Sequence, residues 1–247
     1  MEKDIKDSVK DYWNLRAGGF SDAVEEEMVT ASHKTWKDCF AREIGSGKTV
    51  LDDGCGPGFF SAILAELHND VTGIDYSEEM VEKARQRLQA LALPGKIVRG
   101  DAHRLDFPAE SFDAVVSRNV IWNLKEPEKA YGEIARVLRP GGTLIVNDGN
   151  CYLYLYDPRY KALYEEHVRE ISAKGKSDGG LHGRHNTDNV DFGIIEKLAY
   201  DLPLSKVERP KWDISTLIDL GFYDISVKIS GNTLPMGFTV IARKRDA

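Results

Sequence analysis

Residues 50–58, VLDDGCGPG, carry the strongest indication of how this chain folds. A short apolar run ends in Asp52 and Asp53 and is followed by glycines in a G-x-G-x-G spacing, which predicts a strand that turns into a glycine loop and then a helix. Glycine lets the backbone turn tightly and lets a ligand touch the main chain, where a Cβ would clash. The spacing differs from the G-x-G-x-x-G that accommodates a pyrophosphate at a helix N-terminus. A carboxylate two residues before the first glycine would also repel a phosphate.

Strand and helix patterns alternate outward from this loop. The strands expected from short apolar runs are 49–52, 70–75, 96–100, 112–117, 143–147, 222–229 and 237–242. The helices expected between them are 59–67, 78–91, 126–138 and 212–220. This alternation predicts an α/β fold with a Rossmann-like, seven-stranded, mostly parallel sheet and helices on both faces. The last two strands are expected to pair as an antiparallel C-terminal hairpin.

We expect the 247 residues to form a single domain with two additions to the sheet. Residues 1–46 are expected to be a helical N-terminal cap. Residues 151–210 interrupt the α/β rhythm after the fifth strand and are interpreted as an insertion that caps the substrate site. Five of the chain's ten tyrosines lie at its start, at positions 152, 154, 156, 160 and 164. They line an acceptor pocket or pack their rings on the sheet; the sequence leaves both open.

The amino-acid composition disfavours some classes of binding partner. The chain has 33 basic and 40 acidic residues and a net charge of −7, which disfavours nucleic acid and anionic membranes because each phosphate contact needs a cation. No apolar stretch reaches the ~18 residues of a membrane span, and the N-terminus has no signal-peptide pattern. The three cysteines form no CxxC, so neither a disulfide framework nor a metal site is expected. The expected location is the cytoplasm.

Two acids lie at the ends of the next predicted strands. Asp75 follows the last glycine of the loop by 17 residues (75 − 58), where a carboxylate can accept hydrogen bonds from two ribose hydroxyls. Asp101 and Ala102 follow the third strand, where they can read the edge of an adenine. Both NAD and S-adenosylmethionine contain a ribose whose hydroxyls such a carboxylate could bind. NAD-dependent redox chemistry is therefore an alternative, disfavoured by the glycine spacing.

Four segments together resemble the class I S-adenosylmethionine-dependent methyltransferases. They are VLDDGCGPG (50–58), GIDYSEEMVEKAR (73–85), GDAHRLDFPAESFDAVVSRNVIWNL (100–124) and RVLRPGGTLIV (136–146). They cover residues 40–150 in the order and spacing of the family. The segment SRNV, 117–120, further resembles quinone-ring and related small-molecule methyltransferases. Asp53 departs from the pattern, because family members more often carry an apolar residue there.

The resemblance implies S-adenosylmethionine as cofactor and a set of residues that hold it. Those residues are Tyr12, Arg16, Asp52, Gly54, Gly56, Gly58, Asp75, Tyr76, Met80, Asp101, Ala102, Arg118 and Asn119. Asp52 would lie near the methionine ammonium, with the three glycines against the methionine. Tyr76 and Met80 would flank the adenine, while Arg118 and Asn119 would lie near the transferred methyl. Tyr12 and Arg16 belong to a YWxxRA segment that folds over the cofactor in similar enzymes, where Arg16 would pair with the methionine carboxylate.

The expected reaction is methyl transfer to a small-molecule acceptor by in-line displacement. Positioning and exclusion of water supply much of the acceleration, and a general base is needed only if the acceptor must lose a proton. The candidate bases are His103, His182, His185 and Asp148. The alternative for His182 and His185 is a polar surface loop. The alternative function is a non-catalytic S-adenosylmethionine-binding sensor or partner subunit. The sequence predicts neither the acceptor atom nor the oligomeric state.

Overall fold

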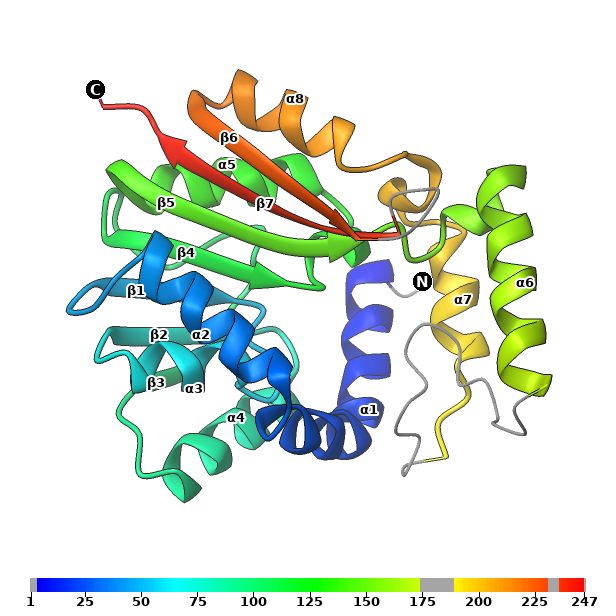
Figure 1. Ribbon diagram of the computed structural model, residues 1–247, viewed down its shortest axis with the longest axis horizontal. Helices are drawn as coiled ribbons and strands as arrows, with labels where there is room; N and C mark the ends of the chain where they lie inside the picture. The colour runs from blue at the N-terminus through cyan, green and yellow to red at the C-terminus, as the bar shows by residue number, and fades with distance from the viewer. Residues whose placement is uncertain (1–3, 174–188, 231–235, 247) are drawn as a thin grey trace.

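A seven-stranded sheet forms the centre of the molecule in the computed structural model, which describes residues 4–173, 189–230 and 236–246 (Figure 1). Its strand order is β3-β2-β1-β4-β5-β7-β6. The strands are β1 (Thr49–Asp53), β2 (Asp70–Asp75), β3 (Lys96–Arg99), β4 (Phe112–Arg118), β5 (Leu138–Gly149), β6 (Phe222–Ser230) and β7 (Gly237–Lys244). The first five are parallel, and β7 pairs antiparallel with both β5 and β6. The predicted α/β fold and its C-terminal hairpin are confirmed.

Helices cover both faces of the sheet (Figure 1). One face carries α2 (Ala31–Glu43), α3 (Phe59–Glu66) and α4 (Glu78–Ala90), and its core includes Val50 and Val116. The other face carries α5 (Pro127–Val137) and α8 (Lys211–Asp219), and its core includes Leu51 and Val115. Successive residues of β1 and β4 thus serve opposite cores, as the two-residue period of a strand requires.

The start of β5 differs from the sequence prediction. The proline and glycines of residues 139–142 were expected to separate a helix from a strand beginning at 143. The strand instead begins at Leu138, and its pairing with β4 jumps from Phe112–Leu138 to Ala114–Thr143. Gly141 has φ +70°, so the extra residues form an irregularity inside the strand rather than a loop before it.

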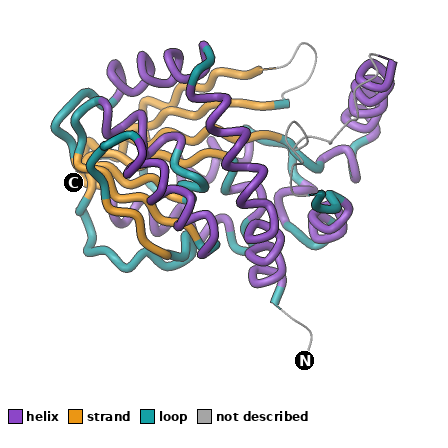
Figure 2. Tube along the Cα trace, turned by 90° about the horizontal axis from the view of Figure 1, so that it is seen from below, coloured by secondary structure: helices purple, strands orange, loops and turns teal. Residues whose placement is uncertain are grey.

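The N-terminal helix α1 (Ile5–Met28) and the segment after β5 lie at the carboxyl end of the sheet (Figures 1 and 2). That segment contains the 3-10 turn η2 (Leu153–Leu155), α6 (Pro158–Ala173), α7 (Gly193–Ala199) and the 3-10 turn η4 (Pro203–Lys206). A further 3-10 turn, η1 (Ile121–Asn123), follows β4. No helix among the described residues is both long and apolar enough to cross a membrane.

Candidate cofactor-binding site

A cavity lies between α1 and the carboxyl ends of the first four strands. Its lining residues are Lys6, Val9, Lys10, Trp13, Phe20, Asp53, Gly54, Gly56, Ile74, Asp75, Tyr76, Ser77, Met80, Gly100, Asp101, Ala102, His103, Arg118, Asn119, Val120, Asn123, Leu124 and Lys125. Ten of the residues predicted from the sequence belong to this set: Gly54, Gly56, Asp75, Tyr76, Met80, Asp101, Ala102, His103, Arg118 and Asn119.

The glycine loop after β1 forms part of the cavity wall. Gly54 has φ +73°, and a Cβ added to it would come within 2.2 Å of Val120 Cγ2. Gly56 has φ +51° and faces Phe20 of α1, which a Cβ would approach to 3.5 Å. Both positions have a left-handed backbone, and at Gly54 there is also no space for a side chain, whereas the 3.5 Å approach at Gly56 is an ordinary contact. Without side chains at these two positions, the loop presents bare main chain to the cavity. Gly58 has another role, because it precedes α3 and lets that helix approach Ala84 of α4, 3.2 Å from a built Cβ.

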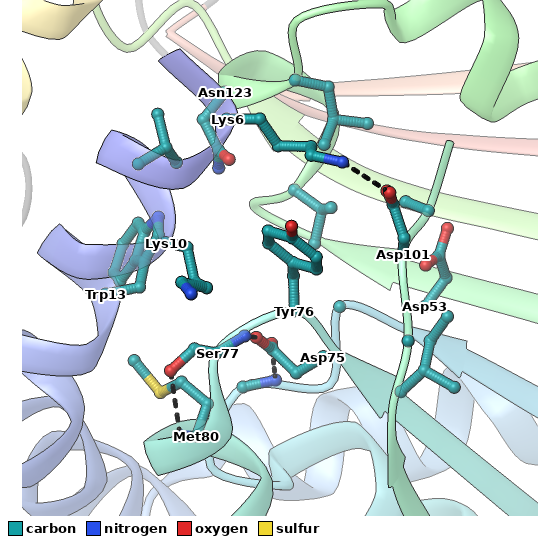
Figure 3. A pocket seen from close by; sticks show the side chains of 18 of the residues that line it. Lys6, Lys10, Trp13, Asp53, Asp75, Tyr76, Ser77, Met80, Asp101 and Asn123 are labelled. Carbon is teal, nitrogen blue, oxygen red and sulfur yellow. Dashed lines mark hydrogen bonds and ion pairs between the residues drawn. The ribbon is translucent and has the colours of Figure 1, made fainter. Parts of the chain in front are cut away.

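Asp75 at the end of β2 is held by the loop. Its Oδ2 accepts a hydrogen bond from the Gly56 N–H and its Oδ1 accepts one from the Ser77 N–H, both at 2.9 Å. Burial raises the pKa of Asp75 to about 6, and these backbone donors oppose that rise. The carboxylate is therefore fixed at the cavity wall (Figure 3), with the remaining lone pairs of both oxygens able to accept further donors.

Asp101 after β3 lies between a histidine and a lysine. His103 Nδ1 lies 2.7 Å from its Oδ1, and Lys6 Nζ of α1 lies 2.9 Å from its Oδ2. Burial alone would raise the pKa of Asp101, but the His103 and Lys6 hydrogen bonds hold it well below its ordinary value. The other ring nitrogen of His103 accepts from the Glu126 N–H at 3.3 Å, which assigns the ring proton to Nδ1. Both nitrogens of this candidate base are engaged.

Helix α1 borders the cavity and makes polar contacts with Tyr76 and Ser77, the two residues that join β2 to α4. Tyr76 donates to Asp7 at 3.1 Å, and Ser77 Oγ donates to Asn14 Oδ1 at 2.6 Å. The ammonium groups of Lys6 and Lys10 lie 4.8 and 5.8 Å from the centre of the Tyr76 ring. Figure 3 shows these α1 side chains facing Tyr76 and Asp101 across the cavity. Sequence patterns gave no signal for Lys6 or Lys10, because an isolated lysine on a helix is usually solvated.

The adjacent acids of β1 point in opposite directions. Asp52 does not line the cavity; its Oδ2 accepts from Ser61 Oγ of α3 at 2.6 Å. Asp53 lines the cavity, is fully buried, and neither of its carboxylate oxygens has a hydrogen-bond partner among the described residues. Burial raises the pKa of each acid to about 7. The resemblance assigned the cofactor contact to Asp52, whereas the structure turns Asp53 into the cavity.

Arg118 and Asn119 line the cavity at the end of β4. Arg118 Nη2 donates to both oxygens of Glu27, at 2.9 and 3.0 Å, and its guanidinium carbon lies 4.7 Å from the centre of the Phe59 ring. The Arg118 charge is thus shared with the C-terminal part of α1. Asn119 has φ +57°, and its carbonyl accepts from Trp122 Nε1 at 3.0 Å.

Tyr12 and Arg16 are buried in α1 but do not line the cavity. Tyr12 belongs to an apolar cluster with Trp122 and Tyr152, and burial raises its pKa to about 12. The Arg16 guanidinium carbon lies 5.1 Å from the centre of the Phe192 ring, in the segment after β5. Both residues therefore join α1 to that segment.

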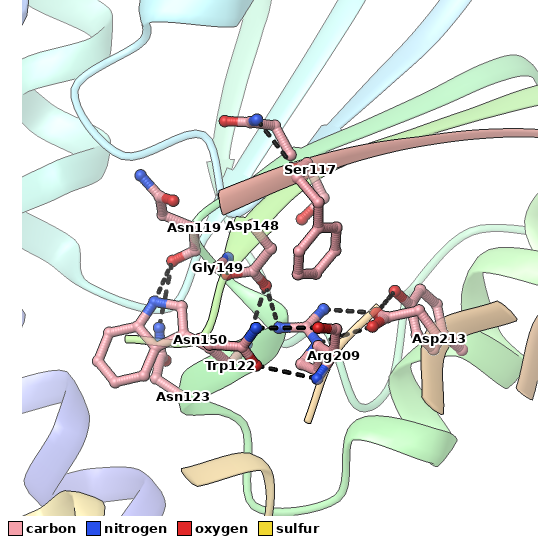
Figure 4. A network of polar contacts seen from close by, with 12 residues as sticks. Ser117, Asn119, Trp122, Asn123, Asp148, Gly149, Asn150, Arg209 and Asp213 are labelled. Carbon is pink, nitrogen blue, oxygen red and sulfur yellow. Dashed lines mark hydrogen bonds and ion pairs between the residues drawn. The ribbon is translucent and has the colours of Figure 1, made fainter. Parts of the chain in front are cut away.

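The remaining candidate bases have different surroundings. His182 and His185 lie outside the described residues. Asp148 is fully enclosed in a polar network (Figure 4), where its Oδ2 accepts from Arg209 Nη1 at 2.7 Å and from the Trp122 N–H at 3.0 Å. No group of three or more histidine, cysteine, aspartate or glutamate side chains within the described ranges could hold a metal ion.

The cavity fits S-adenosylmethionine on several grounds. Bare main chain at Gly54 and Gly56 leaves room for a ligand, and the Asp75 and Asp101 carboxylates suit the hydroxyl and amine donors of a nucleoside. Ile74, Met80 and Val120 supply apolar surface for a purine ring. The unpartnered Asp53 carboxylate suits a ligand with a positive charge.

Comparisons with known proteins agree with this geometry. Residues 51–146 match the family model described as a methyltransferase domain. Over 202 residues the chain is 30% identical to the ubiquinone/menaquinone biosynthesis C-methyltransferase UbiE of Enterobacter sp., covering 76% of this chain and 79% of that protein. It is 42% identical over 102 residues to phosphatidylethanolamine N-methyltransferase of Cereibacter sphaeroides, covering 40% of this chain and half of the length of that protein.

Solved structures share the fold. A protein from Methanococcus maripaludis superposes with a TM-score of 0.62 at 20% identity, covering 95% of this chain and 94% of its own. A SAM-dependent methyltransferase from Aquifex aeolicus has a TM-score of 0.56 at 20% identity, covering 90% and 97%. Sheet order, glycine loop, acidic strand ends and the similarity to UbiE, which covers 76% of this chain, lead to one assignment: the chain belongs to the S-adenosylmethionine-dependent methyltransferases.

Proposed function

We propose that the chain transfers the methyl group of S-adenosylmethionine to a small-molecule acceptor by in-line displacement. The observation that carries the proposal is the cavity itself, which the glycine loop, Asp75 and Asp101 all line. The proposed roles are a ribose contact for Asp75, an adenine-edge contact for Asp101 and Ala102, and adenine packing for Tyr76 and Met80. Asn119 and Arg118 lie at the β4 end, where the methionine part would reach.

The cofactor supplies an already electrophilic methyl group, so the chain's task is to position two molecules and exclude water. The contacts of α1 with Tyr76, Ser77 and Asp101 suit that task because they cover the cavity. The engaged nitrogens of His103 support a reaction in which this histidine positions Asp101 and takes no proton from the acceptor.

The acceptor is proposed to enter from the side of α1 and the segment after β5. Trp13 and Phe20 line the cavity, and their ring centres lie 5.7 Å apart. Trp13 also contacts Tyr12, which belongs to the same apolar cluster as Tyr152 and Tyr154. An acceptor that enters there would meet the aromatic surface of Trp13 and Phe20, which suits a ring or an amine. Because one relative is a C-methyltransferase of ubiquinone/menaquinone biosynthesis and another a phosphatidylethanolamine N-methyltransferase, we propose quinone-related rings and aminolipids as the first acceptors to test.

A turnover screen tests the proposal. The purified chain is incubated with S-adenosylmethionine and, separately, with quinols, phenols, amines, thiols and phosphatidylethanolamine vesicles, and S-adenosylhomocysteine is measured by mass spectrometry. We expect acceptor-dependent S-adenosylhomocysteine with at least one class, and at least about tenfold less from Asp75→Ala at sub-saturating cofactor, because a hydrogen bond to a charged group contributes about 1.5–3 kcal/mol. Tight cofactor binding without turnover on any class would instead support the non-catalytic binding module and contradict the proposal.

A further inference from the structure

Asp53 is a buried acid whose carboxylate receives no hydrogen bond from the described residues around it. It has no exposed surface, it lines the cavity, and both carboxylate oxygens lack a hydrogen-bond partner in the described part of the chain. An ionised carboxylate in such a place costs several kcal/mol unless a cation or donors compensate it. A bound ligand is the group that can supply this compensation.

The other acids of the site are already compensated by the protein. Asp75 accepts two backbone N–H bonds, and Asp52 accepts from Ser61 on the opposite face of the sheet. Asp101 is paired with Lys6 and His103. Asp53 alone among these four acids depends on something that enters the cavity.

The cations that line the cavity are engaged elsewhere or lie across it. Lys6 pairs with Asp101, Arg118 pairs with Glu27, and Lys125 pairs with Asp4 at 2.8 Å. Lys10 lies over the Tyr76 ring. The charged groups that act on Asp53 are the carboxylates of Asp52 in the same strand and of Asp75 and Asp101 at the ends of β2 and β3, so its surroundings favour an incoming positive charge.

The position of Asp53 in the sheet indicates which part of the cofactor it meets. In the strand pairing Asp53 lies between Ile74 of β2 and Ser117 of β4. Asp75 follows Ile74, and Arg118 follows Ser117. The end of β2 is the proposed ribose site and the end of β4 the proposed methionine site. The sulfonium joins ribose to methionine, so it would lie over the strand between them.

We propose that Asp53 recognises the sulfonium charge of S-adenosylmethionine and makes the site prefer the charged donor over the neutral product. This inference rests on the proposed function. In the transfer, a lone pair of the acceptor forms the new bond to the methyl carbon while the sulfur–methyl bond breaks and leaves its electron pair on sulfur. The sulfonium thereby becomes a neutral thioether, and the attraction to Asp53 ends. The residue thereby favours exchange of S-adenosylhomocysteine for fresh cofactor.

The titration of Asp53 supports this role. Burial, followed by the charges of Asp52, Asp75 and Asp101, raises its pKa to about 7. A bound sulfonium stabilises the ionised form, so cofactor binding near neutral pH is expected to release a proton. S-adenosylhomocysteine lacks this charge and is expected to release less.

The test compares affinities for the two ligands by calorimetry at pH 8, in wild type, Asp53→Asn, Asp53→Leu and the control Asp106→Asn. Asp106 is an acid outside the cavity lining with an 87% exposed side chain. Replacing Asp53 is expected to reduce the ratio of S-adenosylmethionine to S-adenosylhomocysteine affinity about tenfold, equivalent to about 1.4 kcal/mol, mainly by weakening S-adenosylmethionine. The control is expected to keep the wild-type ratio.

Proton release is measured in the same titrations with buffers of different ionisation enthalpy at pH 7. Asp53→Asn is expected to lose the difference in proton release between the two ligands, while any proton release from Asp52, Asp75 or Asp101 remains. An unchanged affinity ratio and unchanged proton release in both Asp53 variants would overturn the inference and leave the proposed function intact. A wild-type chain that binds neither ligand would overturn both.

Discussion

The buried carboxyl group of Asp53 is expected to make the stability of the ligand-free protein depend on pH. Its pKa is raised from 3.8 to about 7, so the folded state holds a proton that the unfolded state releases. Stability is therefore lost as pH rises from about 4 to about 7. Asp53→Asn removes this loss, and we expect it to raise the free energy of unfolding by about 1–3 kcal/mol at pH 8 and by less at pH 5.

Urea unfolding of wild type and Asp53→Asn at the two pH values measures this difference. Asp106→Asn is the control, and we expect no change from it because its side chain is exposed. Equal stabilities of wild type and Asp53→Asn at pH 8 would contradict a buried, uncompensated acid at position 53.

His103 is expected to act as a positioning residue for Asp101. Nδ1 donates to Asp101 and Nε2 accepts from the Glu126 N–H, so neither nitrogen is available to an acceptor. His103→Asn retains a donor near Asp101, and we expect its kcat to stay within about threefold of wild type with an unaltered pH profile. His103→Ala is expected to weaken cofactor affinity about tenfold, since an ionised acid loses a hydrogen bond. A pH profile that loses its lower limb in His103→Asn would show that His103 is the base.

Two glycine-to-alanine substitutions distinguish overpacking in the glycine loop from backbone strain alone. Gly54→Ala brings a Cβ to 2.2 Å from Val120 Cγ2 at a left-handed φ, whereas Gly221, also left-handed at φ +85°, has nothing within 4 Å. We expect Gly221→Ala to destabilise the fold by about 1 kcal/mol through backbone strain. Gly54→Ala is expected to cost about 2–4 kcal/mol because overpacking adds to strain. Chemical denaturation distinguishes the two, and equal losses would contradict the packed loop.

Sequence patterns were sufficient to predict which acids lie at the carboxyl ends of β2 and β3. Parallel strands bring their carboxyl ends to one edge of the sheet, so the sequence alone predicts Asp75 and Asp101 beside the glycine loop. The choice between Asp52 and Asp53 could not be made in this way. Val50 and Leu51 face opposite cores, and which of them shares a face with the cavity depends on where α3 packs. Ser61 of α3 donates a hydrogen bond to Asp52. Asp52 therefore faces α3, and Asp53, the next residue of the strand, faces the cavity.

The tyrosine-rich segment marks another limit of sequence reasoning. An extended run would have placed Tyr152 and Tyr154 on one face, but residues Leu153–Leu155 form a 3-10 turn. The Tyr154 ring stacks on Tyr164 with centres 4.0 Å apart, and its hydroxyl donates to Glu196 at 2.5 Å. None of the five tyrosines lines the cavity. Aromatic spacing alone does not distinguish a ligand wall from rings that pack on one another.

Across the molecule, one buried polar network joins helices α5 and α8 and the segment before α8 to strand β5 (Figure 4). Arg209 lies before α8, has no exposed surface, and pairs with Asp148 of β5 at 2.7 Å and with Asp213 of α8 at 2.5 Å. Tyr131 of α5 donates to Asp213 at 2.6 Å. Burial raises the pKa of Asp148, and the Arg209 charge is the largest effect that opposes the rise.

Arg209→Leu is expected to destabilise the fold by about 3–5 kcal/mol, because it leaves buried carboxylates without a cation. Without Arg209 the pKa of Asp148 rises further, so we expect the loss to be larger at pH 8 than at pH 5. Arg159→Leu is the control, since Arg159 makes ion pairs with a 59% exposed side chain, and we expect it to cost less than 1 kcal/mol. Similar losses in the two variants would argue against the buried network as a support of the fold.

The cavity at the carboxyl end of the sheet is expected to hold S-adenosylmethionine. Calorimetric titration of wild type and Asp75→Ala with S-adenosylmethionine, and of wild type with NAD, is the decisive measurement. We expect wild type to bind S-adenosylmethionine and not NAD, and Asp75→Ala to bind S-adenosylmethionine at least about tenfold more weakly. Binding of NAD, or equal S-adenosylmethionine affinity in the two proteins, would contradict the account.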